Sequence, residues 1–233
     1  CGRFRGEVDM IISENKPLEE VLGYLKDFDK LVLVGCNQCA ATCKSGGEEE
    51  VLKMKETLEG EGKKILGYVM LDPACNLLKS KKDLKALKEE TKEADAVLSL
   101  ACGDGTQTIV KNLKDKPVYP ANNTLFIGEV QRVGEYEEAC KACGDCELGW
   151  TGGICPVTMC AKGLMNGACG GAKNGKCEVN SENDCAWIKI YERLEAIGQL
   201  DNLAEIRPPK DYSKQNNPRS LSAKKKKEAA AHS

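Results

Sequence analysis

KLVLVG, residues 30–35, is the stretch that decides the fold predicted from this sequence. A short apolar run bounded by polar residues is typical of a buried strand. Two further runs follow, KILGYVML at 64–71 and AVLSLA at 96–101, and segments with helical spacing separate them. Strands that alternate with helices of about 10–15 residues indicate a parallel sheet with right-handed crossovers. We therefore expect an α/β fold with an open doubly wound parallel sheet in the N-terminal region.

The helices around these strands are predicted from apolar residues that recur every three or four positions. Pro17 suits the first turn of the earliest one. The expected helices cover 17–28, 48–58 and 82–92. With the three strands they give a βαβαβ order, and we assign residues 10–136 to one α/β domain.

A cysteine follows each predicted strand: Cys36, Cys75 and Cys102. The carboxyl ends of parallel strands share one edge of a sheet, where open α/β folds form their functional crevice. Cys39 and Cys43 complete a triplet with Cys36, so five thiols are expected at this edge as metal ligands. Cys75 or Cys102 is the fourth ligand of the triplet. We favour Cys102, because its glycine-rich turn, ACGDG, lets the backbone approach a bound group.

A second, cysteine-rich region is assigned to residues 137–206. It opens with EACKACGDCELGW at 138–150, in which Cys140, Cys143 and Cys146 have the spacing that begins a bacterial ferredoxin run. Cys155 precedes a proline, as ligating cysteines often do, and is the best candidate for a fourth ligand. The long gap before it departs from the ferredoxin pattern, so a ferredoxin fold is not implied.

Four later cysteines are less specific. A third cluster, structural zinc and buried free thiols are all compatible with them; they are Cys160, Cys169, Cys177 and Cys185. Few apolar residues surround them, so we expect this region to depend on bound metal for its fold. A closing helix with one apolar face follows Cys185.

Composition limits the classes of function. The chain has 233 residues and a net charge of −2, which argues against a basic nucleic-acid-binding surface. It contains no apolar run of the length that spans a bilayer and no signal-peptide pattern, so a cytoplasmic location without membrane insertion is expected. In a reducing cytosol, its fourteen cysteines indicate metal binding rather than disulfides.

The only histidine is His232, near the C-terminus. Catalytic arrangements that need histidine are therefore not expected in the folded part, and we predict no catalytic residues. Dinucleotide-binding and P-loop motifs are also missing from the sequence. Residues 1–9 are expected to be leader or vector-derived, and 207–233 a disordered tail.

Close thiolates without histidine favour iron–sulfur clusters over zinc, which typically uses separated ligand pairs. The base prediction is two [4Fe–4S] clusters, with a third cluster or a zinc ion as the further metal. The alternative function is a zinc-thiolate structural or interaction module. A zinc-thiolate methyltransferase is a third, weaker alternative.

Two stretches resemble a known family. GGICPVTMCAKGLMNGACGGAKNGKCEVNSENDCAWIKIYERL, residues 152–194, resembles the methylenetetrahydrofolate reductase C-terminal domain. VGCNQCAATCKSGG, residues 34–47, resembles the N-terminal part of the small iron–sulfur (MetV-type) subunit of the bacterial reductase. The resemblance covers about residues 10–206 and excludes both ends.

This resemblance implies an oxidoreductase complex of one-carbon metabolism, in the Wood–Ljungdahl pathway. Its partner is a TIM-barrel subunit that carries FMN and binds the folate. The present chain would pass electrons to that FMN, which reduces 5,10-methylenetetrahydrofolate to 5-methyltetrahydrofolate. The donor would be ferredoxin or a nicotinamide-oxidising subunit. Clusters carry single electrons and hydride transfer needs two, so a flavin must stand between them.

Overall fold

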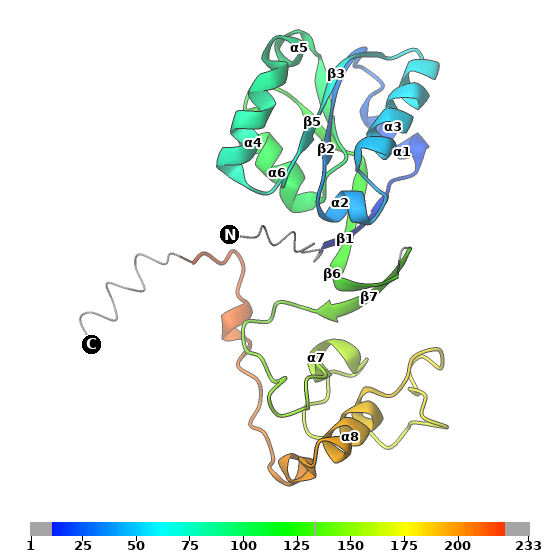
Figure 1. The fold of residues 1–233 in the computed structure, drawn as a ribbon, viewed down its shortest axis with the longest axis vertical. Helices are drawn as coiled ribbons and strands as arrows, with labels where there is room; N and C mark the ends of the chain where they lie inside the picture. The colour runs from blue at the N-terminus through cyan, green and yellow to red at the C-terminus, as the bar shows by residue number, and fades with distance from the viewer. Residues whose placement is uncertain (1–10, 133, 222–233) are drawn as a thin grey trace, which may run out of the picture. The chain divides into compact units, whose positions relative to one another are not determined.

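The computed structural model describes residues 11–132 and 134–221 (Figure 1). The chain divides into two compact units, unit 1 up to Glu138 and unit 2 from Ala139 onward. The predicted leader at 1–9 lies outside the described residues, as does the end of the predicted tail. No helix in the described part is both long and apolar enough to cross a bilayer.

Unit 1 is built around a four-stranded parallel sheet. Its strand order is β3-β2-β4-β5, and every neighbouring pair is parallel. The predicted apolar runs form its three longest strands, which confirms the α/β class. The strands are β2 (Lys30–Cys36), β3 (Lys64–Leu71), β4 (Ala96–Ser99) and β5 (Val118–Pro120).

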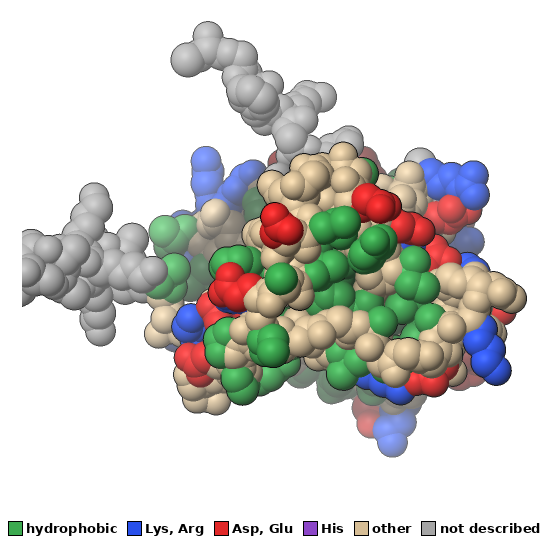
Figure 2. All heavy atoms as spheres, turned by 90° about the horizontal axis from the view of Figure 1, so that it is seen from below, with side chains coloured by type: hydrophobic (Ala, Val, Ile, Leu, Met, Phe, Trp, Pro, Cys, Tyr) green, Lys and Arg blue, Asp and Glu red, His purple; other side chains and the backbone are tan. Residues whose placement is uncertain are grey.

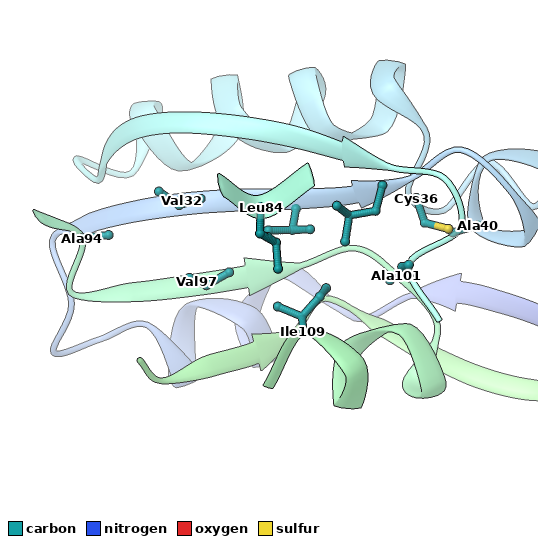
Figure 3. Close-up of a cluster of buried hydrophobic side chains, with 11 residues drawn as sticks. Val32, Cys36, Ala40, Leu84, Ala94, Val97, Ala101 and Ile109 are labelled. Carbon is teal, nitrogen blue, oxygen red and sulfur yellow. The ribbon is translucent and has the colours of Figure 1, made fainter. Parts of the chain in front are cut away.

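Helices cover both faces of this sheet, so it is doubly wound (Figure 1). They are α1 (Leu18–Tyr24), α2 (Cys39–Thr42), α3 (Glu48–Gly60), α4 (Leu77–Asp83), the 3₁₀ helix η1 (Leu84–Leu87), α5 (Lys88–Glu93) and α6 (Gly103–Asn112). Successive strand residues point to opposite faces. Leu31 and Leu33 pack with α1 and α3, whereas Val32 packs with Leu84 and Ile109 (Figure 3).

The helix predicted at 82–92 is wrong in its extent. It begins at Leu77, where the side chain of Asn76 accepts the backbone N–H of Lys79 at 3.0 Å, and η1 interrupts it. In a 3₁₀ helix residues three apart lie on one side. The tighter winding thus places both Leu84 and Leu87 against the sheet.

A second sheet in unit 1 was not predicted. It has three strands in the order β1-β6-β7, namely β1 (Ile11–Asn15), β6 (Asn122–Arg132) and β7 (Glu135–Cys140). β1 pairs antiparallel with β6, and Ile11 lies opposite Ile127. β1 has only five residues, and its partner strand lies more than a hundred positions away. Its local sequence pattern is therefore too weak to predict a strand.

Unit 2 has little regular structure. Its helices are α7 (Pro156–Met159), α8 (Ala186–Ala196) and the 3₁₀ helices η2 (Leu200–Ala204) and η3 (Tyr212–Gln215). α8 is the expected closing helix, and its Trp187, Ile190 and Leu194 form a small buried core with Cys185. The structure differs from the disordered tail that was predicted from residue 207 onward. η3 is helical, and Lys210 is buried with its ammonium group donating to the backbone carbonyl of Asp145.

Candidate functional site

Cys36 and Cys102 lie beside the point where the sheet reverses its winding. β2 is followed along the chain by β3 on one side, and β4 lies on its other side, so the carboxyl ends of β2 and β4 flank the topological switch point. Cys36 is the last residue of β2, and Cys102 directly precedes α6. Their exposed fractions are only 5% and 7%. This is the place where open α/β sheets bind ligands.

Two further cysteines are brought to the same end of the sheet. Cys39 begins α2, and Cys75 lies in the loop after β3. Their neighbours Ala40 and Ala74 belong to the same buried cluster as Cys36. Ala101, beside Cys102, also belongs to that cluster; Figure 3 shows Ala40, Ala101 and the sulfur of Cys36 together. The loops after three parallel strands thus converge at one edge.

Burial is the main influence on these thiols. It raises the pKa of both Cys36 and Cys102 above the usual value. It also raises the pKa of Cys75, to which the carboxylate of Asp104 adds. Negative charge on Cys39 or Cys102 raises the pKa of Cys36 and Cys75 further. The charges of Cys39 and Cys102 therefore act on the neighbouring thiols of this group.

Backbone N–H groups oppose this effect at two of the sulfurs, because they stabilise thiolate. The donors are Gln38 and Ala74 at Cys36, and Asp104 and Gly105 at Cys102. Amide donors to cysteine sulfur are also one means by which proteins set the potential of iron–sulfur clusters. The donor set, four thiols with amide support and no imidazole, fits such a cluster. The sequence does not show which amides these are, because a backbone donor leaves no side-chain signature.

Cys43 stands apart from this group. Its half-buried thiol donates to the carbonyl of Ile11 on β1 at 3.7 Å. It is not among the largest influences on the pKa of Cys36, Cys75 or Cys102. The sequence predicted either Cys75 or Cys102 as the fourth ligand beside the triplet. In the structure both residues lie at the same end of the sheet as Cys36 and Cys39.

The loop that carries Cys39 is held by both sheets of unit 1. On one side the N–H of Cys36 donates to the carbonyl of Gly46 at 2.9 Å. On the other side the hydroxyls of Ser13 and Ser45 lie 2.9 Å apart, and the hydroxyl of Tyr136 donates to the carbonyl of Thr42 at 3.1 Å. The second sheet therefore braces this loop.

The ferredoxin-like triplet begins at the last residue of β7, Cys140, and continues into the loop that follows. Cys140 and Cys146 are exposed, and Cys143 and Cys155 are half-buried. The Sγ of Cys143 donates to the carbonyl of Asp145 at 3.5 Å, and Cys155 caps α7. Among the hydrogen bonds that the described residues make, none joins one of these four thiols to another.

The four later cysteines meet around one small cavity of about 20 Å³ in unit 2. These four cysteines are free thiols. Within residues 11–132 and 134–221, no three His, Cys, Asp or Glu side chains are close enough to share one metal ion as they stand. A cubane cluster needs wider spacing than a single ion, because each cysteine binds a different iron.

Unit 2 also has an apolar cavity of about 570 Å³. The two tryptophans contribute to its lining, and the guanidinium carbon of Arg207 lies 4.1 Å from the ring centre of Trp150. Trp187 is buried and donates its indole N–H to the carbonyl of Leu164 at 3.0 Å, which confirms a packing role. Apolar side chains gather among charged ones on the lower face of the molecule (Figure 2).

The fold and the site define the class of protein. It is an α/β domain with several thiols at the switch point of its sheet, and it is joined to a cysteine-rich unit. Residues 119–213, less than half of the chain, match the model of a family described as methylene-tetrahydrofolate reductase C terminal. The chain therefore contains a segment of a family associated with this oxidoreductase. No curated protein and no solved structure matches the chain.

Proposed function

We propose that this protein is the iron–sulfur electron-transfer subunit of a methylenetetrahydrofolate reductase. It passes electrons from ferredoxin or a nicotinamide-oxidising subunit to FMN on a TIM-barrel partner, which reduces 5,10-methylenetetrahydrofolate to 5-methyltetrahydrofolate. The match of residues 119–213 to the reductase family supports the assignment to this reductase. The proposed location is the cytoplasm.

The electron-transfer role rests on one observation: four thiols converge at the switch point of the sheet. Cys36, Cys39, Cys75 and Cys102 would hold one [4Fe–4S] cluster, which accepts and donates one electron when bound. Cys36 and Cys102 supply buried ligands with two amide donors each. Cys75 is exposed, so this ligand would lie on the solvent side of the site.

A second cluster is proposed at Cys140, Cys143, Cys146 and Cys155. The glycine at 144 and Ala142 both have positive φ, +82° and +49°, so the backbone turns sharply on either side of Cys143. Such a winding loop can direct closely spaced thiols to one point. The exposure of Cys140 and Cys146 is suited to an electron-transfer partner at this loop.

The described residues contain no histidine, since His232 lies beyond them. We therefore assign the folate chemistry to the partner chain. The same thiols are compatible with the alternative, a zinc-thiolate interaction module without redox activity.

The test is anaerobic purification of the full chain, followed by metal and acid-labile sulfide analysis. We expect brown protein with broad absorbance near ~400 nm and about eight irons per chain for two cubanes. Added to the FMN-containing partner, the dithionite-reduced and desalted chain should bleach the flavin absorbance. A colourless protein with stoichiometric zinc and no sulfide would replace this proposal with the interaction module.

A further inference from the structure

Four cysteines that are scattered along unit 2 surround one cavity: Cys160, Cys169, Cys177 and Cys185. They come from separate segments. Cys160 directly follows α7 and Cys185 directly precedes α8. Cys160 and Cys185 also pack in the same apolar cluster as Trp187. The fold, not local spacing, therefore brings these thiols together.

The size of the cavity selects among their possible ligands. About 20 Å³ corresponds to little more than one water-sized sphere. That space matches a single metal ion once the thiols close around it. Lys162 and Glu178 line the cavity together with Ala168, Ala172, Ala186 and Trp187, so apolar groups and one lysine–glutamate pair surround the thiols.

Backbone pairing fixes two of the four positions. Residues Lys173 to Asp184 form a small hairpin through bridges at Lys176. The N–H of Cys177 donates to the carbonyl of Asn183 at 2.9 Å, and that of Cys185 donates to Gly175 at 2.7 Å. This pairing holds the backbones of Cys177 and Cys185 in one small hairpin, so these two thiols start from neighbouring positions.

Charged groups tie this hairpin to α8. The carboxylate of Asp184 accepts hydrogen bonds from Lys176 at 2.7 Å and lies 2.8 Å from the ammonium group of Lys189. Two lysines on one carboxylate leave net positive charge next to Cys185. A tetrathiolate that holds a divalent cation carries two negative charges, so these lysines would offset part of them.

We propose that Cys160, Cys169, Cys177 and Cys185 bind one zinc ion that holds unit 2 together. Tetrahedral coordination by four thiolates is typical of structural zinc. On binding, Zn²⁺ replaces the four thiol protons, which pass to solvent. Zinc has no redox chemistry, so this site lies outside the proposed electron path and is independent of it.

No three of these four thiols are close enough to share an ion as they stand, so their side chains must move together when the ion binds, and Cys169 must also leave a competing partner. Its Sγ lies 3.2 Å from the carboxylate of Glu178, which also pairs with Lys162. Cys169 is exposed, and rotation of its side chain about one bond is inexpensive at a surface. In the zinc-bound form we expect Glu178 to keep Lys162 and to release Cys169.

The first test uses the full chain, purified anaerobically, with zinc, iron and sulfide measured together. We expect about one zinc per chain. Cys177→Ser should lose it and keep its iron and sulfide. Glu178→Gln is the matched control, because Glu178 lines the same cavity without being a ligand, and it should keep the zinc.

The second test does not depend on a variant that folds. X-ray absorption at the zinc edge of the unmodified protein should show four sulfur neighbours at about 2.3 Å. Zinc held by oxygen or nitrogen, or protein without zinc, overturns the proposal. Loss of iron from Cys177→Ser also overturns it, in favour of a third cluster. Zinc with four sulfurs in protein that lacks iron would reject only the electron-transfer role.

Discussion

The backbone carbonyl of Gly46 accepts the N–H of Cys36 at 2.9 Å, so the loop that carries Cys39 returns to the end of the strand it left. A Cβ atom at Gly46 would lie 1.7 Å from the carbonyl oxygen of Leu100. Only glycine fits between β2 and the segment after β4. This close approach fixes the distance between two of the strands that supply the thiols.

Gly46→Ala should therefore damage the site. The added methyl group meets backbone rather than a flexible side chain, so the loop must shift. We expect the free energy of unfolding of unit 1 to fall by about 1–3 kcal/mol or more, together with loss of iron. Gly23→Ala is the control: nothing lies within 4 Å of its added Cβ atom in α1, and it should stabilise by about 0.5–1 kcal/mol.

The ligand set at the switch point can be tested by three serine variants. Cys75→Ser and Cys102→Ser should each remove about four irons per chain, because a cubane contains four. Cys43→Ser should retain them, since the thiol of Cys43 bonds to Ile11. Iron and sulfide analysis with electron paramagnetic resonance of the reduced proteins measures this. Iron loss in Cys43→Ser with full iron in Cys75→Ser would restore the triplet as the ligand set.

Leu98→Ala should destabilise unit 1 strongly. Leu98 lies on β4 with no exposed surface, and truncation of a buried leucine costs about 2–5 kcal/mol. Leu78→Ala, on α4 with 78% of the residue exposed, should change stability by less than about 0.5 kcal/mol. Urea unfolding followed by circular dichroism reports both units, whereas tryptophan fluorescence reports only unit 2, where both tryptophans lie. The Leu98 effect should therefore be missing from the fluorescence curve.

Alkaline pH should weaken unit 1 through the start of α1. Glu20 accepts hydrogen bonds from Lys16 at 2.6 Å and Tyr24 at 2.5 Å, and these bonds raise the pKa of both donors. A group whose pKa is raised on folding stabilises the protein at any pH below the pKa that it has in the unfolded state. This contribution is lost as the pH rises through the pKa of the folded state. The loss should therefore appear above about pH 10.

Glu20→Gln removes the charge that raises the pKa of Lys16 and Tyr24. Its stability should be lower than that of the unmodified protein at pH 8, and the difference should disappear above the folded pKa values. Urea unfolding between pH 8 and pH 11 measures this, and Glu19→Gln on the same helix is the control. Parallel pH curves for all three proteins would contradict the prediction.

The apolar runs at 30–35, 64–71 and 96–101 were sufficient to predict the parallel sheet, because a buried strand needs apolar residues on both faces. The same runs placed Cys36, Cys75 and Cys102 at one edge. The three strands of the second sheet were missed. Their pairing joins residues near 11–15 to residues near 122–127, and such distant partners leave no local pattern.

The sequence by itself determined the chemistry available to this protein: many thiols, a single histidine at position 232, and a sheet edge at which strands end in cysteine. Only the tertiary structure showed that the thiol of Cys43 donates to Ile11 on β1, and gathered four other cysteines around one cavity in unit 2. The physical reason is that spacing along a chain fixes distance only within a single element. Which loops meet depends on how strands order themselves and on where a glycine allows two backbones to touch.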